Sequence, residues 1–180
     1  MDFRGKSFLF SVVDKVSAIA DSICIVCGFH AAEIEKAVRQ EVYKKYDILL
    51  VKNQTYQKGM LTSLQTGIAA LKSADWILYH FVDQPHIPGA FYTAFRNQIR
   101  EGTEWIQPRF RNKNGHPILI HKTLIEPIVT LSGQESLRDL NRYRNFRKTF
   151  WDCPFPQIAE DFDTVEDLSE YRTDVHRNNV

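Results

Sequence analysis

Hydrophobic residues follow two alternating patterns along the first half of the chain. Over residues 9–20 they recur with the three- and four-residue spacing of an amphipathic helix, and the unbroken apolar run over 23–26 that follows is typical of a buried strand. The same alternation then repeats. We expect further helices over 31–46, about 60–72 and 91–100, and further strands over 47–51 and 76–82.

This alternation predicts an α/β fold. Continuous apolar strands separated by helices are typical of a Rossmann-like, three-layer structure in which a mostly parallel sheet has helices on both faces. Ligands of such folds bind at the carboxyl ends of the strands. Beyond Trp105 the pattern changes to shorter strands, expected over 105–107, 118–121 and 149–153, which we interpret as a substrate-facing extension of the same domain. A last helix is expected near Val165, and residues 173–180 read as a frayed tail.

Composition narrows the class of protein. The 180 residues carry a formal charge of +1 and are 43% hydrophobic, which predicts one folded domain and argues against a disordered, nucleic-acid-binding or membrane protein. Three cysteines are too few and odd in number for a secreted disulfide framework, so we expect a cytoplasmic protein. Only eight glycines are present, and neither common phosphate-loop motif occurs. The expected partner is therefore a small molecule.

Two acidic segments are candidates for binding a divalent cation. Asp83 directly follows the expected strand over 76–82, where a carboxylate can hold Mg²⁺ against a triphosphate. An ordinary Asp-x-Pro turn is the competing interpretation. The second segment, residues 160–167, contains Asp163 and stands before an expected helix, which it could simply cap. Taken with Asp83, it offers a second oxygen ligand for the same ion.

Polar groups that could bind the rest of a substrate occur at three other places. The segment from Asn53 to Ser63 follows a strand and opens a helix, so its amide, hydroxyls and backbone N–H groups could bind a base or sugar, or simply cap the helix. His116, in a Gly-His-Pro turn, could donate to a phosphate or a substrate ring, or be merely exposed. Basic residues over 109–113 and 138–148 could receive a phosphorylated substrate or form a solvated surface.

The order of these motifs is more specific than any one of them. The series Val26-Cys27-Gly28, Asn53 to Leu64, Asp83-Gln84-Pro85, Pro108 with Gly115-His116-Pro117, and Asp161 to Leu168 resembles the MobA-like nucleotidyltransferase domain. Within it, the closest branch is the molybdenum cofactor cytidylyltransferases (MocA-like). The similarity extends over about residues 3–168 and implies a fold like that of the nucleotide-diphospho-sugar transferases.

The resemblance implies a reaction and a set of roles. A phosphate of the molybdopterin cofactor would attack the α-phosphate of an NTP, CTP being favoured, and release pyrophosphate, with Mg²⁺ as the cofactor. Asp83 and Asp163 would be the catalytic, metal-binding carboxylates. The remaining implied residues are Lys6, Gly28, Asn53, Gly59, Met60 and Ser63 for the nucleotide, and Pro108, Gly115, His116 and Pro117 for the pterin substrate.

The sequence also departs from the family pattern. Family members begin with a strand and a Gly-rich loop around the triphosphate, whereas this chain begins at the segment that normally follows, so we expect a central strand of the sheet to be missing. Ser132 to Ser136 stands where the family has a Gly-Asp-x-Gly turn. The alternative is therefore a degenerate member that binds a nucleotide, a pterin or a molybdoenzyme partner without catalysis. A relative of the sugar-nucleotide pyrophosphorylases is a third possibility.

Overall fold

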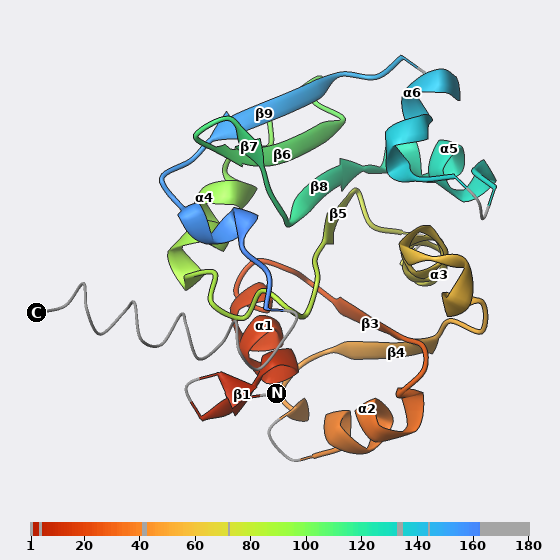
Figure 1. The fold of residues 1–180 in the computed structure, drawn as a ribbon, viewed down its shortest axis with the longest axis vertical. Helices are drawn as coiled ribbons and strands as arrows, with labels where there is room; N and C mark the ends of the chain where they lie inside the picture. Colours follow the sequence, from red (N-terminus) through yellow and green to blue (C-terminus); the bar gives the residue numbers. More distant parts are fainter. Residues whose placement is uncertain are drawn as a thin grey trace, which may run out of the picture.

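The arrangement of helices and strands is that of an α/β protein (Figure 1). The structure, a computed structural model, describes residues 2–3, 5–40, 43–71, 73–132, 135–143 and 145–162. The α-helices are α1 (Phe8–Val16), α2 (Ala31–Val38), α3 (Met60–Ala70), α4 (Gly89–Arg96), α5 (Ile125–Thr130) and α6 (Leu140–Tyr143). The strands are β1 (Asp2–Phe3), β2 (Lys6–Ser7), β3 (Ile23–Cys27), β4 (Ile48–Lys52), β5 (Trp76–Tyr79), β6 (Trp105–Phe110), β7 (Lys113–Asn114), β8 (Ile118–His121) and β9 (Lys148–Asp152).

The first parallel pair, β3 and β4, lies between helices. The two strands pair in register from Ile23 opposite Ile48 to Cys27 opposite Lys52. Ile25 packs with Val13 of α1 on one face. On the other face α3 lies so close that a Cβ on Gly67 would be 3.1 Å from Cγ2 of Val26. The apolar runs of these strands are therefore covered on both sides, as their sequence predicts.

The larger sheet is also covered on both faces. Its strand order is β5-β8-β6-β7, with β9 pairing along β6. Because side chains alternate along a strand, Ile77 and Ile120 point into the apolar cluster that contains α3 and α5, whereas Leu119 points into the cluster built on Phe91 and Phe95 of α4. The α/β class is thus confirmed.

The prediction of a mostly parallel sheet was wrong. Among the described residues only the β3–β4 and β6–β9 pairings are parallel, and the other four are antiparallel. One reason is local: Arg111 and Asn112 both have positive φ, the conformation of a tight hairpin turn, and they return the chain from β6 antiparallel into β7. In the described part of the chain β3 pairs only with β4 and β5 only with β8, so the sheet is interrupted. The missing strand itself stays a prediction.

Two elements are shorter than the apolar pattern predicts. The helix expected over 31–46 ends at Val38, and the strand expected over 76–82 ends at Tyr79. The strand ends because Tyr79 pairs with Ile118, so the next residue would face Pro117, which has no N–H to donate to the ladder. The helix expected near Val165 and the tail over 173–180 lie outside the described residues. Within the described part, no helix is both long and apolar enough to cross a membrane.

The strand ends fall in two places. In Figure 1, β3 and β4 end beside α2 and the start of α3, whereas β5 ends on the side of α1. Residues that follow β3 and β4 are therefore separated from those that follow β5.

Candidate functional site

The loop after β5 is bound to the acidic segment near the end of the described chain. The backbone oxygen of Asp83 accepts a 3.0 Å hydrogen bond from the N–H of Phe162. Gln84, only 1% exposed, donates from Nε2 to Oδ1 of Asp161 at 2.8 Å and to the backbone oxygens of Ile158 and Glu160, both at 3.3 Å. The two acidic segments that the sequence singled out are thus in contact, although Asp163 itself lies outside the described residues.

Two histidines of this loop contact aromatic side chains. Nε2 of His80 lies 2.8 Å from the hydroxyl of Tyr92, and the ring of His86 lies 4.2 Å from that of Phe162. The pKa of His80 is lowered to about 3 and the pKa of His86 to about 4. Burial is the largest cause in each case, and the positive charge of Lys15 also lowers both pKa values. Burial, with a smaller contribution from the charge of Asp83, raises the pKa of Tyr79 to about 12. The rings of His80, His86 and Tyr79 are therefore poorly hydrated.

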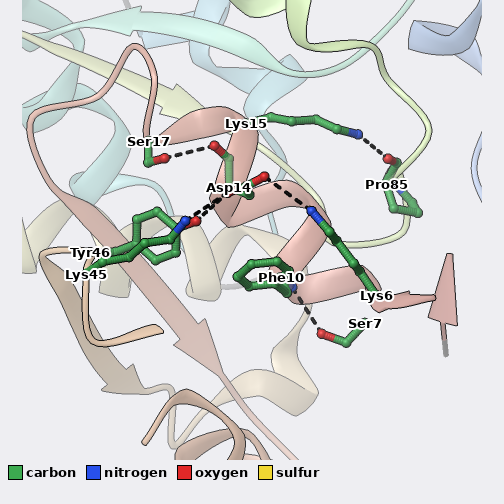
Figure 2. Close-up of polar contacts among 9 residues, drawn as sticks. All are labelled: Lys6, Ser7, Phe10, Asp14, Lys15, Ser17, Lys45, Tyr46 and Pro85. Carbon is green, nitrogen blue, oxygen red and sulfur yellow. Dashed lines mark hydrogen bonds and ion pairs between the residues drawn. The ribbon is translucent and has the colours of Figure 1, made fainter. Parts of the chain in front are cut away.

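A lysine from α1 reaches the same loop. Nζ of Lys15 donates to the backbone oxygen of Pro85 at 2.5 Å, across 70 positions of sequence (Figure 2). The neighbouring Asp14 points the other way, toward Lys6, Lys45 and Tyr46. Lys15 thus brings a positive charge to the Asp83 loop, where phosphate groups would be attracted.

The Gly-His-Pro turn lies beside the acidic segment. The N–H of Gly115 donates to the backbone oxygen of Pro108, and that of His116 to the backbone oxygen of Ile158, both at 2.9 Å. Pro117 follows a cis peptide bond. The ring of His116 is 4.6 Å from the ring of Phe81, which stands two positions before Asp83. Burial lowers the pKa of His116, against a smaller opposing effect of the charge of Asp161. The structure therefore brings the expected substrate-side residues and Asp83 into one region.

The Asn53 turn forms a second, separate region. Asn53, 2% exposed, donates from Nδ2 to Oγ1 of Thr62 at 2.9 Å and to Oγ of Ser63 at 3.1 Å. Its Oδ1 accepts from both the N–H and the hydroxyl of Thr55, at 2.9 and 3.0 Å. In this structure the amide of Asn53 thus links the end of β4 to the start of α3.

Four other residues are expected to bind the nucleotide. Gly28, Gly59 and Met60 lie around this turn, and Lys6 does not. A Cβ on Gly28 would lie 2.7 Å from the ring of Tyr56, so only glycine lets that ring lie against the backbone. Gly59 adopts φ +110°, and Met60 is 71% exposed. Lys6 instead lies on β2, where its ammonium is 3.6 Å from the carboxylate of Asp14 (Figure 2). The structure does not bring the turn and Lys6 together.

The donor set around Asp83 suits a hard divalent cation. Among the described residues no group of three or more histidines, cysteines and acids is arranged to hold a metal. Carboxylates are nevertheless present in both contacting segments, Asp83 in the loop and Asp161 in the acidic segment, and Oε1 of Gln84 is buried with no hydrogen-bond partner in the described part of the chain. Carboxylate and amide oxygens are the type of ligand that Mg²⁺ prefers. The residues present therefore fit Mg²⁺ at this loop.

Several residues of the site escaped the sequence analysis. Gln84 is part of the Asp83-Gln84-Pro85 motif, in which the resemblance assigns it no role of its own, and Lys15 is only one residue of the expected amphipathic helix over 9–20. His80 carried a usable signal, because a histidine inside the run Trp76 to Val82 needs a buried partner. The predicted basic surface is partly neutralised: Arg109 pairs with Asp152 at 2.7 Å and Arg142 with Asp139 at 3.0 Å.

Fold and site together define an α/β protein whose polar loops gather beyond the ends of its strands. Residues 1–148 match the MobA-like NTP transferase domain family, and the chain belongs to this family. The part of the resemblance that names the family is thereby confirmed. A comparison with curated proteins finds no match.

Solved structures with the same fold include three kinds of protein. Rv0371c from Mycobacterium tuberculosis is 20% identical, with a TM-score of 0.71 over 98% of this chain and 87% of that one; the same protein was also crystallised with manganese. A 4-diphosphocytidyl-2C-methyl-D-erythritol synthase from Anaerococcus prevotii is 16% identical, with a TM-score of 0.77 over 97% and 88%. Molybdopterin-guanine dinucleotide biosynthesis protein A from Archaeoglobus fulgidus is 10% identical, with a TM-score of 0.68 over 98% and 89%. At these identities the likeness shows the fold alone.

Proposed function

We propose that this protein is a nucleotidyltransferase of the molybdenum cofactor cytidylyltransferase type. A phosphate oxygen of molybdopterin attacks the α-phosphorus of an NTP, with CTP favoured, the bond to the β-phosphate oxygen breaks, and pyrophosphate leaves. The observation that carries the proposal is the contact between the Asp83 loop and the acidic segment 158–162, found in a member of an NTP transferase family. A cytoplasmic location, with free cysteines, is part of the same proposal.

The residues would act by position and charge, because phosphoryl transfer needs little covalent chemistry from the protein. A bound Mg²⁺ would neutralise the charge on the phosphates. Asp83 would hold it, with Asp163 proposed as the second ligand. Lys15 places a positive charge at the same loop. The Gly-His-Pro turn would receive the pterin.

A second candidate function is nucleotide, pterin or molybdoenzyme binding without catalysis. The observation that favours it is the Asn53 turn, whose amide is fully engaged inside the protein and which lies at different strand ends from Asp83. In that case the roles of Gly28, Asn53, Gly59, Met60 and Ser63 would be to build the turn.

The test is pyrophosphate release from each NTP with molybdopterin and Mg²⁺, comparing Asp83→Asn with Asp75→Asn. Asp75 precedes the same strand, is 74% exposed and pairs with Lys122, so it is a matched control. We expect CTP-dependent release that EDTA abolishes and that Asp83→Asn lowers by about a hundredfold or more, since a charge-stabilising group is lost. Saturable nucleotide or pterin binding without any release would instead support the second candidate. Equal release from both variants would exclude a catalytic role for Asp83.

A further inference from the structure

Gln84 has a bonding pattern that none of the proposed roles explains. Its buried Nε2 lies within 3.3 Å of three acceptor oxygens, and all three belong to residues 158–161, more than 70 positions along the chain. One acceptor is the carboxylate of Asp161, at 2.8 Å, so this bond is charge-assisted and among the stronger kinds.

The two segments that meet at Gln84 are the acidic ones. One main-chain bond adds to the contact, from the N–H of Phe162 to the backbone oxygen of Asp83. The imidazole of His86 lies 3.6 Å from the carboxylate of Glu160. Of these contacts, only the Gln84 bond to Asp161 directly orients a carboxylate of the acidic segment by a donor from the Asp83 loop.

We propose that Gln84 is a positioning residue for the cation site: its amide holds segment 158–162 against the Asp83 loop, so that carboxylates from both segments can serve one divalent cation. The inference rests on the proposed function, to which it adds the element that assembles the site. The other end of the amide is not used by the fold, because Oε1 is buried without a hydrogen-bond partner among the described residues.

The competing explanation is that Gln84 only fills space and stabilises the fold. Gln65 provides the comparison, because its Nε2 likewise donates to backbone oxygens of a distant segment, those of Ile128 and Leu131 at 3.0 and 2.9 Å. Gln65→Leu therefore removes a similar set of bonds at a place with no proposed role.

The experiment uses the whole chain and Mn²⁺ alone as the probe, with free Mn²⁺ measured by electron paramagnetic resonance. Gln84→Leu should weaken Mn²⁺ binding about tenfold to a hundredfold, the usual effect of losing a residue that orients a metal ligand. In the same variant, hydrogen exchange over residues 158–162 should become faster. Gln65→Leu should change neither.

A swap of donor and acceptor tests the bond to Asp161 itself. Gln84→Glu sets two carboxylates against each other and should speed exchange over 158–162 as Gln84→Leu does. Adding Asp161→Asn restores a donor facing an acceptor and should return part of the protection. If Gln84→Leu fails to fold, the comparison of Gln84→Glu with the double variant Gln84→Glu and Asp161→Asn still tests the bond.

The outcomes separate the two proposals. Mn²⁺ binding and exchange that both stay at the level of the unsubstituted chain in Gln84→Leu would overturn the positioning role. So would an equal loss in Gln65→Leu, or no recovery in the double variant. If the unsubstituted chain binds no Mn²⁺, the proposed metal site and its positioning residue fall together, while the exchange data still report whether Gln84 holds the segment.

Discussion

The state of single buried side chains decides how this molecule responds to acid. His80 and His86 belong to the loop that carries Asp83, and both imidazoles stay neutral in the folded protein because burial disfavours their charged form. In the unfolded chain both would gain protons near their ordinary pKa of 6.5. The folded state therefore binds fewer protons than the unfolded state below that pH.

Folding stability should consequently fall as the pH drops below 6.5. Since the pKa of His80 in the folded protein is about 3, the unfolded state alone takes up its proton between pH 6 and pH 4. His80 costs about 1.4 kcal/mol per pH unit over this window, whereas His86, with a pKa of about 4 in the folded protein, does so only over the upper part of it. His80→Gln, which cannot titrate, should reduce the slope of unfolding free energy against pH by that amount, measured by urea denaturation at several pH values.

His30→Gln is the control for this prediction, since the side chain of His30 is 66% exposed. If His80→Gln left the slope of unfolding free energy against pH unchanged, His80 would be taking up its proton as readily in the folded protein as in the unfolded chain.

At the scale of elements, close backbone contacts determine where the substrate-side turn lies. The turn at Gly115 joins β7 to β8 and packs against the 3₁₀ turn Pro156–Ala159. A Cβ added to Gly115 would lie 2.3 Å from the backbone oxygen of Ile158, which also accepts the bond from His116. The glycine therefore fixes the distance between the turn and the acidic segment.

Gly115→Ala should accordingly separate these two elements. We expect a loss of unfolding free energy of about 1–3 kcal/mol, the usual cost of forcing atoms into a packed site, together with faster exchange of the His116 amide. Gly89→Ala is the matched control, because a Cβ there meets nothing within 4 Å and the residue begins α4. Denaturation curves that coincide for both variants would contradict this account of the turn.

The sequence predicted local elements better than their pairing. The apolar runs at β3, β4 and β8 and the helix at α3 lie within a residue or two of their predicted bounds, because they depend on side-chain period alone. Strand direction and length did not follow from period: β5 ends where Pro117 would have to pair, a contact between residues about 37 positions apart. Gln84 was missed for the same reason, since its partners are remote in sequence.

At the scale of the molecule, two helices join the separate pieces of sheet. Ile68 of α3 packs with Ile77 of β5, while the same helix lies over β3 at Gly67. On the opposite side, Val13 of α1 packs with Ile25, and Val16 packs with the cluster around α4. Shared helices can thus couple strands that exchange no hydrogen bonds, and the single domain predicted from the sequence depends on this coupling.

A single cooperative unfolding transition should follow. The three tryptophans lie on β5, β6 and β9, so their fluorescence reports on the larger sheet, whereas far-ultraviolet circular dichroism reports on all elements. Both signals should show the same midpoint in urea. Ile68→Ala opens a cavity at a residue that is 1% exposed, so it should lower the free energy of unfolding by about 2–5 kcal/mol. Fluorescence and circular dichroism should report the same loss.

The control is Met60→Ala at the exposed start of α3, which should change stability by no more than about 0.5 kcal/mol. If Ile68→Ala shifted the fluorescence transition but left a second transition by circular dichroism in place, the smaller sheet would be folding as a unit of its own. The shared helices would then be packing against two domains instead of holding one together, and the interruption between β3 and β5 would mark a domain boundary.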